Sequence, residues 1–382
     1  MSVLKSIGLF VFSLVLTLLI LEGMVRIFSP QDLRLNFSQW DEYVGFVNIP
    51  GIEGTTIHTD YRMRVRINSK GLRDREFDYK KEPGTYRIGI FGDSFTFGEG
   101  VQNNETFPKL LENLLQADEQ LSRSGKKIQV LNFGIGKTGT SHQYALYRKE
   151  GKKYDLDLVI IGFLSANDFS DNVPGVFTLK EGRLIHSPAN YSSIRKLQKI
   201  VYYIPFYEWL TAHSHLVNLV RKKATQLDDH WRTTARAPLK IIGDAQAHKE
   251  LLTVDITLKL IKEFVSEARR AGTKLMLVNL PAKDHAPYSA QGKNEPHIVY
   301  YHRLEKELKR ISGLEIIDMT HLFNRLPVEP YYFTHDNHMT PLGLQLVALG
   351  IKDYLKPKLA AELEMGNYKA KKAPVGLKGN ET

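Results

Sequence analysis

The pattern of hydrophobic positions divides the chain into three stretches of different character. Apolar residues run from Ile7 to Leu21, interrupted only by Ser13 and Thr17. A polar stretch rich in glycine and proline then continues to residue 84, and within it residues 61–67 alternate as a strand does. From residue 85, short apolar runs alternate with helical patterns, which predicts a parallel sheet covered by helices on both faces.

The alternating region predicts the following strands and helices. Strands are expected at 86–91, 128–133, 158–163, 274–280 and 314–318. Helices are expected at 107–115, 141–150, 251–271, 300–311 and 341–355. Residues 173–247 interrupt the rhythm as an insertion, and much of Ile194–Arg232 within it is expected to be helical. In an open parallel sheet, functional groups collect at the carboxyl ends of the strands.

These changes of pattern predict four parts. Residues 1–28 form a signal-anchor or transmembrane segment, and residues 29–84 form an irregular lead-in with short strands. Residues 85–362 form the α/β domain, which contains the insertion 173–247. Residues 363–382 are expected to be a basic, flexible tail.

The N-terminal apolar run favours a membrane anchor that is not removed. A transmembrane helix needs ~20 residues, and Gly23–Phe28 can lengthen the run toward the interface. No small-x-small cleavage pattern follows, which favours a signal-anchor over a cleaved signal peptide. Lys5 is the charged side chain that precedes the run, so we expect a cytoplasmic N-terminus and an extracytoplasmic, periplasmic body.

Composition narrows the chemistry. The 382 residues are 42% hydrophobic, enough for a large core, and they include no cysteine, which excludes disulfides, thiolate catalysis and cysteine-ligated zinc. The net charge is +10, but basic residues cluster only at Arg221–Lys223 and Lys369–Lys372. No nucleic-acid-binding motif accompanies them, so nucleic acid is not an expected partner.

Candidate catalytic groups follow the predicted strands. Ser94 lies at a strand-to-helix turn, and Asn167 follows the third strand. A serine nucleophile needs a base, a group that orients the base, and donors for the oxyanion. Asp336 and His338 precede the last helix, which the topology returns to the same edge.

Four segments resemble the motif blocks of SGNH (GDSL-like) hydrolases, in the same order. They are GDSFTFGEGV at 92–101, VLNFGIGKTG at 130–139, GFLSANDFSDN at 162–172 and HDNHMTPLG at 335–343. Upstream, INSKGLRDREF at 67–77 is similar to the lead-in of many membrane-anchored bacterial members. The resemblance covers about residues 67–355.

The resemblance implies a flavodoxin-like sheet of about five parallel strands, and an esterase or acyltransferase that requires no metal or organic cofactor. Ser94 matches the nucleophile, Asp336 the orienting acid and His338 the base. The oxyanion donors would be the Ser94 N–H, a backbone N–H of the second block, and the Asn167 amide.

The chain departs from the family pattern at three places. Lys137 occupies the glycine position of the second block, where a left-handed backbone would strain it; Gly136 is the alternative donor after a one-residue shift. Ser165 replaces the glycine of the third block. The fourth segment has Asp-x-His spacing, which resembles the exopolysaccharide O-acetyltransferase branch and leaves open a contribution from His335 or Asn337.

Less specific interpretations accompany these assignments. Asp93 is as good a helix cap as Ser94, and Asn167 with Asp168 is typical of an Asx turn. The aromatic residues Tyr202, Tyr203, Phe206, Tyr207 and Trp209 fit core or lid packing first, and a membrane-facing patch second.

The function expected from the sequence is therefore that of a serine esterase or O-acyltransferase. It would act on ester groups, above all acetyl groups, of a carbohydrate. The alternative is a catalytically inactive, membrane-tethered protein of the same fold that binds carbohydrate or serves in assembly. The bilayer is the other expected partner, and the oligomeric state is left open.

Overall fold

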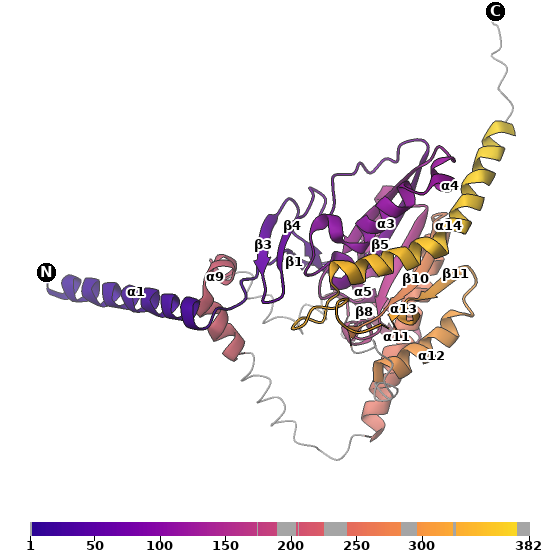
Figure 1. Cartoon of the computed structure of the whole chain (residues 1–382). Helices are drawn as coiled ribbons and strands as arrows, with labels where there is room; N and C mark the ends of the chain where they lie inside the picture. Colours follow the sequence, from indigo (N-terminus) through magenta and orange to yellow (C-terminus); the bar gives the residue numbers. More distant parts are fainter. Residues whose placement is uncertain are drawn as a thin grey trace, which may run out of the picture.

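The computed structural model describes residues 2–173, 175–188, 204, 206–224, 243–283, 296–323 and 326–372. A long N-terminal helix, α1 (Ser2–Phe28), projects from an α/β body (Figure 1). Its side chains are almost all exposed. Among the described residues, it is the one helix long and apolar enough to cross a membrane, and a signal sequence would have the same properties.

The body is built on a five-stranded sheet in the order β11-β10-β7-β5-β6. The strands are β5 (Thr85–Gly92), β6 (Lys127–Gly134), β7 (Leu158–Leu164), β10 (Lys274–Leu280) and β11 (Leu314–Asp318). Each neighbouring pair is parallel. Numbered along the chain, the order is 2-1-3-4-5, which is the flavodoxin-like arrangement. The predicted α/β fold is therefore confirmed.

Both faces of the sheet are covered by helices, because successive strand residues point to opposite faces and are apolar on both. On one face, Phe91, Ile161 and Leu277 pack with α5, α11 and α12; on the other, Ile90, Ile160 and Val278 pack with α3 and α14. The helices of the body are α3 (Phe107–Gln116), α4 (Glu119–Ser122), α5 (Thr140–Lys149), α6 (Asp168–Asp171), α11 (Gly243–Arg270), α12 (Pro296–Leu308), α13 (Thr320–Phe323) and α14 (Pro341–Lys372). Two 3₁₀ turns, η1 (Asn103–Glu105) and η2 (Gly151–Tyr154), complete the body.

The last helix corrects one expectation. We expected the helix to end at Leu355 and a flexible tail to begin at residue 363, but α14 continues to Lys372. Leu359, Ala360 and Leu363 are buried in the core cluster on that face of the sheet. This packing, together with a run of good helix formers, extends the helix past the predicted boundary. Residues 373–382 lie outside the described residues.

The lead-in is more ordered than its polar composition suggests. It forms two antiparallel hairpins, β1 (Ser38–Asp41) with β2 (Gly45–Asn48), and β3 (Glu53–Ile57) with β4 (Arg62–Arg66). Phe37, Met63, Val65 and Ile67 form a small core with Phe97 of helix α2 (Ser94–Phe97). The lead-in is thereby packed against the segment that carries Ser94.

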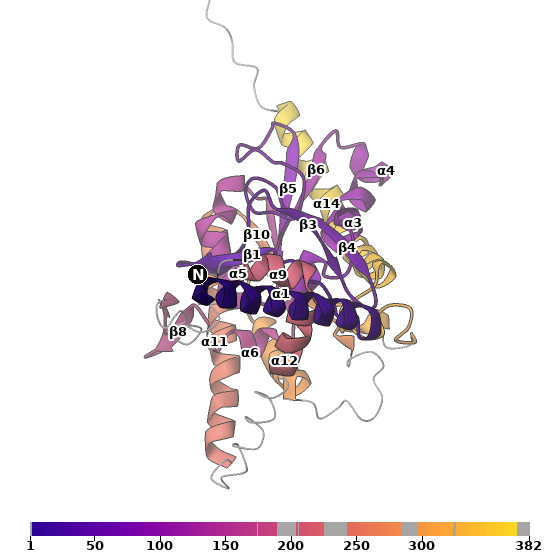
Figure 2. The ribbon, with the colours of Figure 1, turned by 90° about the vertical axis from the view of Figure 1, so that its left-hand side faces the viewer.

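The insertion begins with a hairpin that the sequence pattern did not predict, β8 (Phe177–Lys180) with β9 (Arg183–His186). Helix α9 (Tyr207–His213) and a helical stretch at 215–224 lie within the predicted helical range Ile194–Arg232. The rest of that range, with Tyr202 and Tyr203, lies outside the described residues. Viewed from the side of α1, α9 lies next to the junction of α1 with the body (Figure 2).

Candidate active site

Ser94 is placed by the end of the central strand β5. The Asp93 carboxylate accepts a hydrogen bond from the Phe95 N–H at 2.9 Å and caps α2, so Ser94 becomes the first residue of that helix. Gly92 allows the tight turn, because a Cβ atom there would lie 2.0 Å from the Thr96 hydroxyl. The Ser94 side chain therefore stands at the carboxyl edge of the sheet.

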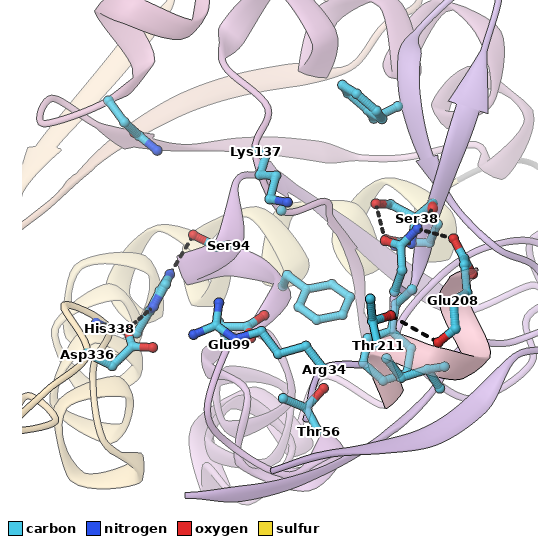
Figure 3. A pocket seen from close by; sticks show the side chains of 18 of the residues that line it. Arg34, Ser38, Thr56, Ser94, Glu99, Lys137, Glu208, Thr211, Asp336 and His338 are labelled. Atoms are coloured by element: carbon cyan, nitrogen blue, oxygen red, sulfur yellow. Dashed lines mark hydrogen bonds and ion pairs between the residues drawn. The ribbon is translucent and has the colours of Figure 1, made fainter. Parts of the chain in front are cut away.

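Ser94, His338 and Asp336 are brought together although they are far apart in sequence. The Ser94 Oγ and His338 Nε2 atoms are 2.7 Å apart. The His338 Nδ1 atom is hydrogen-bonded to Asp336 Oδ1, which also accepts the backbone N–H of His338 at 3.0 Å. Figure 3 shows the three side chains in a row along one wall of a cavity. This is the geometry of a hydroxyl, its base and the group that orients the base.

The charges of this row favour a basic imidazole. Burial disfavours the protonated form of His338, but the hydrogen bond and negative charge of Asp336 outweigh it and raise the pKa of His338 above its ordinary value. Burial likewise opposes ionisation of Asp336, and its bonds to His338 and Tyr61 hold the pKa of this carboxyl well below its usual range. Asp336 is therefore an anion at neutral pH.

A residue of the lead-in supports the far side of Asp336. The Tyr61 hydroxyl donates to Asp336 Oδ2 at 3.0 Å, and His58 Nε2 lies 3.9 Å from the same atom. The Tyr61 ring stacks on His58 with centroids 4.7 Å apart. Burial and the charges of Glu99 and Asp336 raise the pKa of Tyr61, so its hydroxyl keeps the proton that it donates.

The turn between β3 and β4 also holds the loop that carries Asp336. Asp60 Oδ2 accepts the backbone N–H groups of His335 at 2.7 Å and of Asp336 at 2.9 Å. Asp60 Oδ1 lies 2.7 Å from His335 Nδ1. His335 is thus engaged by Asp60, and Asn337 is exposed, so His338 is the histidine of this segment that reaches Ser94.

A buried arginine fixes the other end of helix α2. Arg73 is 1% exposed, and its guanidinium donates to the carbonyl oxygens of Phe97 at 3.0 Å and of Val101 at 2.5 Å. The guanidinium also lies over the Phe97 ring, 4.7 Å from its centroid. These contacts bind the free carbonyl group at the end of the short helix and tie the helix to the loop that follows it, which restricts the position of Ser94.

The second block places both candidate oxyanion residues beside Ser94. Lys137 has a φ angle of +64°, the left-handed conformation that a glycine adopts without strain. The strain expected for a lysine at this glycine position is therefore present, at ~1–2 kcal/mol. Gly136 lies next to the serine, since a Cβ atom built on it would be 4.0 Å from Ser94 Cβ. Both residues line the cavity.

Asn167 is attached to the same turn through Asp93. Its amide Nδ2 donates to Asp93 Oδ2 at 2.9 Å, and one of its two N–H groups is thereby used. The second N–H is left for a ligand in the cavity that Asn167 lines. Burial raises the pKa of Asp93, and burial together with the Asp93 charge raises the pKa of Asp168. A negative charge on Asp93 therefore disfavours ionisation of Asp168.

The cavity in front of Ser94 has a volume of about 660 Å³. Its walls come from three sources: the family blocks, the lead-in and the insertion (Figure 3). The lead-in contributes Arg34 and residues 35–38, and the insertion contributes Tyr207, Glu208 and Thr211. Of these wall residues, the sequence pattern singled out Tyr207 alone, as one of the aromatic residues expected in a core or lid. It indicated no role for the others, nor for Tyr61, Asp60 and Arg73. Arg73 lies in the segment that is similar to the lead-in of anchored members, and this similarity was the one available signal.

Comparison with known proteins agrees with the fold. A model of the GDSL-like lipase/acylhydrolase family matches residues 90–346. Among curated proteins, no matching sequence was found.

Several solved structures also match the chain, at low sequence identity and with TM-scores below 0.5. A GDSL-like lipase from Bacteroides thetaiotaomicron is 12% identical, covering 74% of this chain and 93% of its own, with a TM-score of 0.38. A lipase/acylhydrolase from Enterococcus faecalis is 14% identical over 72% of this chain and 96% of its own, with a TM-score of 0.38. A catalytic mutant of an acetylxylan esterase from Geobacillus stearothermophilus is 13% identical over 70% of this chain and 93% of its own, with a TM-score of 0.39. The family match covers more than half of the sequence, and the chain therefore belongs to the GDSL-like lipase/acylhydrolase family.

Proposed function

We propose that the chain is a serine esterase or O-acyltransferase that acts on ester groups, above all acetyl groups, of a carbohydrate. The observation that carries the proposal is the row of hydrogen bonds from Ser94 Oγ through His338 to Asp336. It lies in the wall of a cavity large enough for a sugar unit, in a chain of an acylhydrolase family.

In the proposed reaction, His338 Nε2 takes the Ser94 proton while Oγ attacks the ester carbonyl carbon. Asp336 stabilises the imidazolium that forms. The ester C–O bond then breaks, His338 returns the proton to the leaving alcohol, and the acyl group remains on Ser94. Water or a second hydroxyl attacks this acyl-Ser94 with His338 as base, which gives a carboxylic acid or a new ester and restores the serine.

The oxyanion of each tetrahedral intermediate would be held by preorganised donors. We assign this role to the Ser94 N–H, to a backbone N–H at Gly136 or Lys137, and to the second N–H of Asn167. A single donor of this kind contributes ~10²–10³ in kcat.

The polar groups on the cavity wall opposite Ser94 are consistent with a substrate rich in hydroxyl groups. Asn36 Nδ2 donates to Glu208 Oε1 at 2.8 Å, and Ser38 Oγ donates to Asn36 Oδ1 at 3.1 Å. Carboxylate and amide oxygens keep further lone pairs that accept hydroxyl groups. The Asp-x-His spacing of Asp336 and His338, which resembles the exopolysaccharide O-acetyltransferase branch, favours the same class of substrate.

We also propose that α1 is retained as a membrane anchor and that the α/β body lies outside the cytoplasm, in the periplasm. Fractionation of cells should then leave the full-length chain in the membrane pellet. Protease added to whole cells should cleave the α/β body only after the outer membrane is made permeable. A full-length chain in the soluble fraction would contradict the anchor.

The catalytic role of Ser94 is tested with a fluorophosphonate, which reacts with activated serines. We expect one adduct, located on Ser94 by mass spectrometry, and none in Ser94→Ala. Ser122→Ala is a matched control that removes a surface serine far from the cavity. An unlabelled Ser94 in folded protein would favour the inactive, carbohydrate-binding alternative.

Hydrolysis and transfer are separated by their products. With an aryl acetate as donor and an oligosaccharide as acceptor, hydrolysis releases acetate at a rate independent of the acceptor. Transfer gives an acetylated oligosaccharide and a faster release of the phenol. Neither product in Ser94→Ala is expected.

A further inference from the structure

The C-terminal end of α1 is hydrogen-bonded directly to the insertion. Glu22 directly follows the last residue of the apolar run, and its carboxylate accepts the Ser214 hydroxyl at 2.8 Å. It also accepts the backbone N–H groups of His215 at 3.0 Å and of Leu216 at 2.9 Å. These contacts cap the helical stretch 215–224. The start of the stretch 215–224 is therefore held next to Glu22, where the apolar run of α1 ends.

Further contacts on the same side make this junction a defined one. The Arg26 guanidinium donates to the carbonyl oxygen of His213 at 2.9 Å. The backbone N–H of Gln31 donates to His215 Nδ1 at 2.8 Å. Helix α1 has 27 residues, and at ~1.5 Å per residue it spans ~40 Å, more than a hydrocarbon core of ~30 Å. The last turns of α1, and α9 with them, therefore reach the lipid headgroups when α1 spans a bilayer.

Helix α9 has two unlike faces. Tyr207, Glu208 and Thr211, which share a face by their spacing, line the cavity in front of Ser94. Phe206 and Trp209 are instead 79% and 59% exposed, so the expectation that they pack in a core or lid is wrong for these two residues. An exposed tryptophan and phenylalanine on the back of a cavity wall need another partner.

Other exposed apolar residues lie on the two helical segments that meet at this junction. Val220 on the stretch 215–224 is 61% exposed, and Ile27 and Phe28 at the end of α1 are 74% and 80% exposed. The neighbouring residues Lys222 and Lys223 are exposed and basic, whereas Arg221 beside them lines the cavity. Aromatic side chains flanked by basic ones are typical of protein surfaces that lie at the lipid–water interface.

We propose that Ile27, Phe28, Phe206, Trp209 and Val220 form an interfacial surface that inserts into the headgroup region of a phospholipid bilayer. This surface would fix the α/β body against the membrane, with the opposite face of α9 forming part of the cavity. The cavity wall is then held by the membrane itself. The inference rests on α1 spanning a bilayer, and it does not depend on the catalytic roles of Ser94 and His338.

The absence of cysteine makes a direct test possible in the full chain. Phe206→Cys, Trp209→Cys and Val220→Cys are each spin-labelled in nanodiscs of phosphatidylethanolamine and phosphatidylglycerol that hold one copy of the chain. Leu14→Cys, on the exposed surface of α1, is the lipid reference. Leu349→Cys, an exposed leucine of α14, is the water reference, because α14 runs away from α1 (Figure 1).

The readout is collision of the label with oxygen, which enriches in lipid, against collision with a water-soluble nickel complex. We expect the labels at 206, 209 and 220 to favour oxygen as the label at 14 does, and the label at 349 to favour nickel. If 206, 209 and 220 match 349 while 14 reports lipid, the interfacial surface is refuted and the anchor stands. Nickel accessibility at 14 would refute both.

A second copy of the chain is the competing occupant of this surface. It predicts that the three labels are shielded only in vesicles that hold many copies, and that they are open to nickel in single-copy nanodiscs. That result would overturn the proposal. Circular dichroism of each labelled variant shows whether the fold is kept, so that loss of structure is recognised separately.

Discussion

Replacing Tyr61 with phenylalanine removes one hydroxyl group from behind Asp336 and leaves the ring in place. The ring keeps its stacking on His58 and its contact with Phe333, whose centroid is 4.9 Å away. What is lost is the hydrogen bond of 3.0 Å to Asp336 Oδ2, together with the longer contact of 3.4 Å to Glu99 Oε1. Asp336 Oδ1 keeps its bonds to His338, so the row of groups that leads to Ser94 remains connected.

The size of the effect follows from the environment of that oxygen. A hydrogen bond to a charged group contributes about 1.5–3 kcal/mol. The Asp336 side chain is 11% exposed, so water replaces part of the lost bond and the lower end applies. The hydroxyl holds Asp336, and through Asp336 the imidazole of His338, in position. Since ~1.4 kcal/mol is a factor of ten in rate, we expect this loss of positioning in Tyr61→Phe to lower kcat/KM by up to about tenfold. Tyr61 is not among the described residues that line the cavity, so KM should stay nearly constant.

The pH profile gives a second, independent readout. Loss of the Tyr61 donor leaves more negative charge on Asp336, which raises the pKa of His338 further. His338 must be neutral to accept the Ser94 proton, so activity rises with pH through the pKa of His338. The acid limb of kcat/KM should therefore move to higher pH in Tyr61→Phe. A purely structural role for Tyr61 would not move it.

A matched control is available in the same fold. Tyr86→Phe removes a hydroxyl that donates to the Glu362 carboxylate at 3.3 Å, at the opposite end of β5 from Ser94. We expect its kcat/KM and pH profile to equal those of the unmodified chain, measured with an aryl acetate. The reasoning is refuted if a folded Tyr61→Phe also retains both, or if Tyr86→Phe loses as much as Tyr61→Phe.

Four further changes test neighbouring parts of the structure. Asp336→Asn should lower kcat by about 10³–10⁴ because it removes the anion and favours the wrong tautomer of His338, and steady-state kinetics would show it. Asn167→Ala should lower kcat by ~10²–10³ with a small change in KM, if its amide binds the oxyanion; an unchanged kcat would exclude that role. Lys137→Gly should raise the midpoint of urea unfolding, because it relieves ~1–2 kcal/mol of left-handed strain at a cost of ~0.5–1 kcal/mol in backbone entropy, and an equal or lower midpoint would contradict this. Burial raises the pKa of Asp74 to about 6, so its native form holds a proton that the unfolded chain has lost, and stability falls as the pH rises from about 4 to about 6. Asp74→Asn should remove up to about 3 kcal/mol of that fall, measured by urea unfolding at both ends of the range.

The fold was predictable because its strands are buried on both faces. A strand such as Leu158–Leu164 is then a continuous apolar run, and two strands, Lys274–Leu280 and Leu314–Asp318, begin and end where the sequence pattern placed them. The end of α14 was not predictable in the same way. The turns that follow Leu355 are stabilised by burial of Leu359 and Leu363 against other parts of the chain, and local composition does not reveal such contacts.

Some residues of the candidate site could be predicted from the sequence, and others could not. Ser94, Asn167, Asp336 and His338 occupy positions fixed by the family blocks, and the structure brings Ser94, His338 and Asp336 into one hydrogen-bonded row. Tyr61 carries no such signal. It is separated from Asp336 by 275 positions, and their contact exists only because a small apolar core docks the β3–β4 hairpin on helix α2.

This division between predicted and unpredicted residues has a functional meaning. The groups that we propose for acyl transfer lie on turns of the sheet, at the carboxyl ends of the strands, where the fold sets their geometry. The groups that would meet the substrate beyond the acyl carbon, such as Arg34 and Glu208, lie on the lead-in and the insertion. Both segments are held by contacts specific to this chain, including the bond from Asn36 to Glu208 that joins them across the cavity. If the proposed function holds, changes in these two segments should alter which alcohol is recognised while the row of hydrogen bonds from Ser94 to Asp336 stays intact.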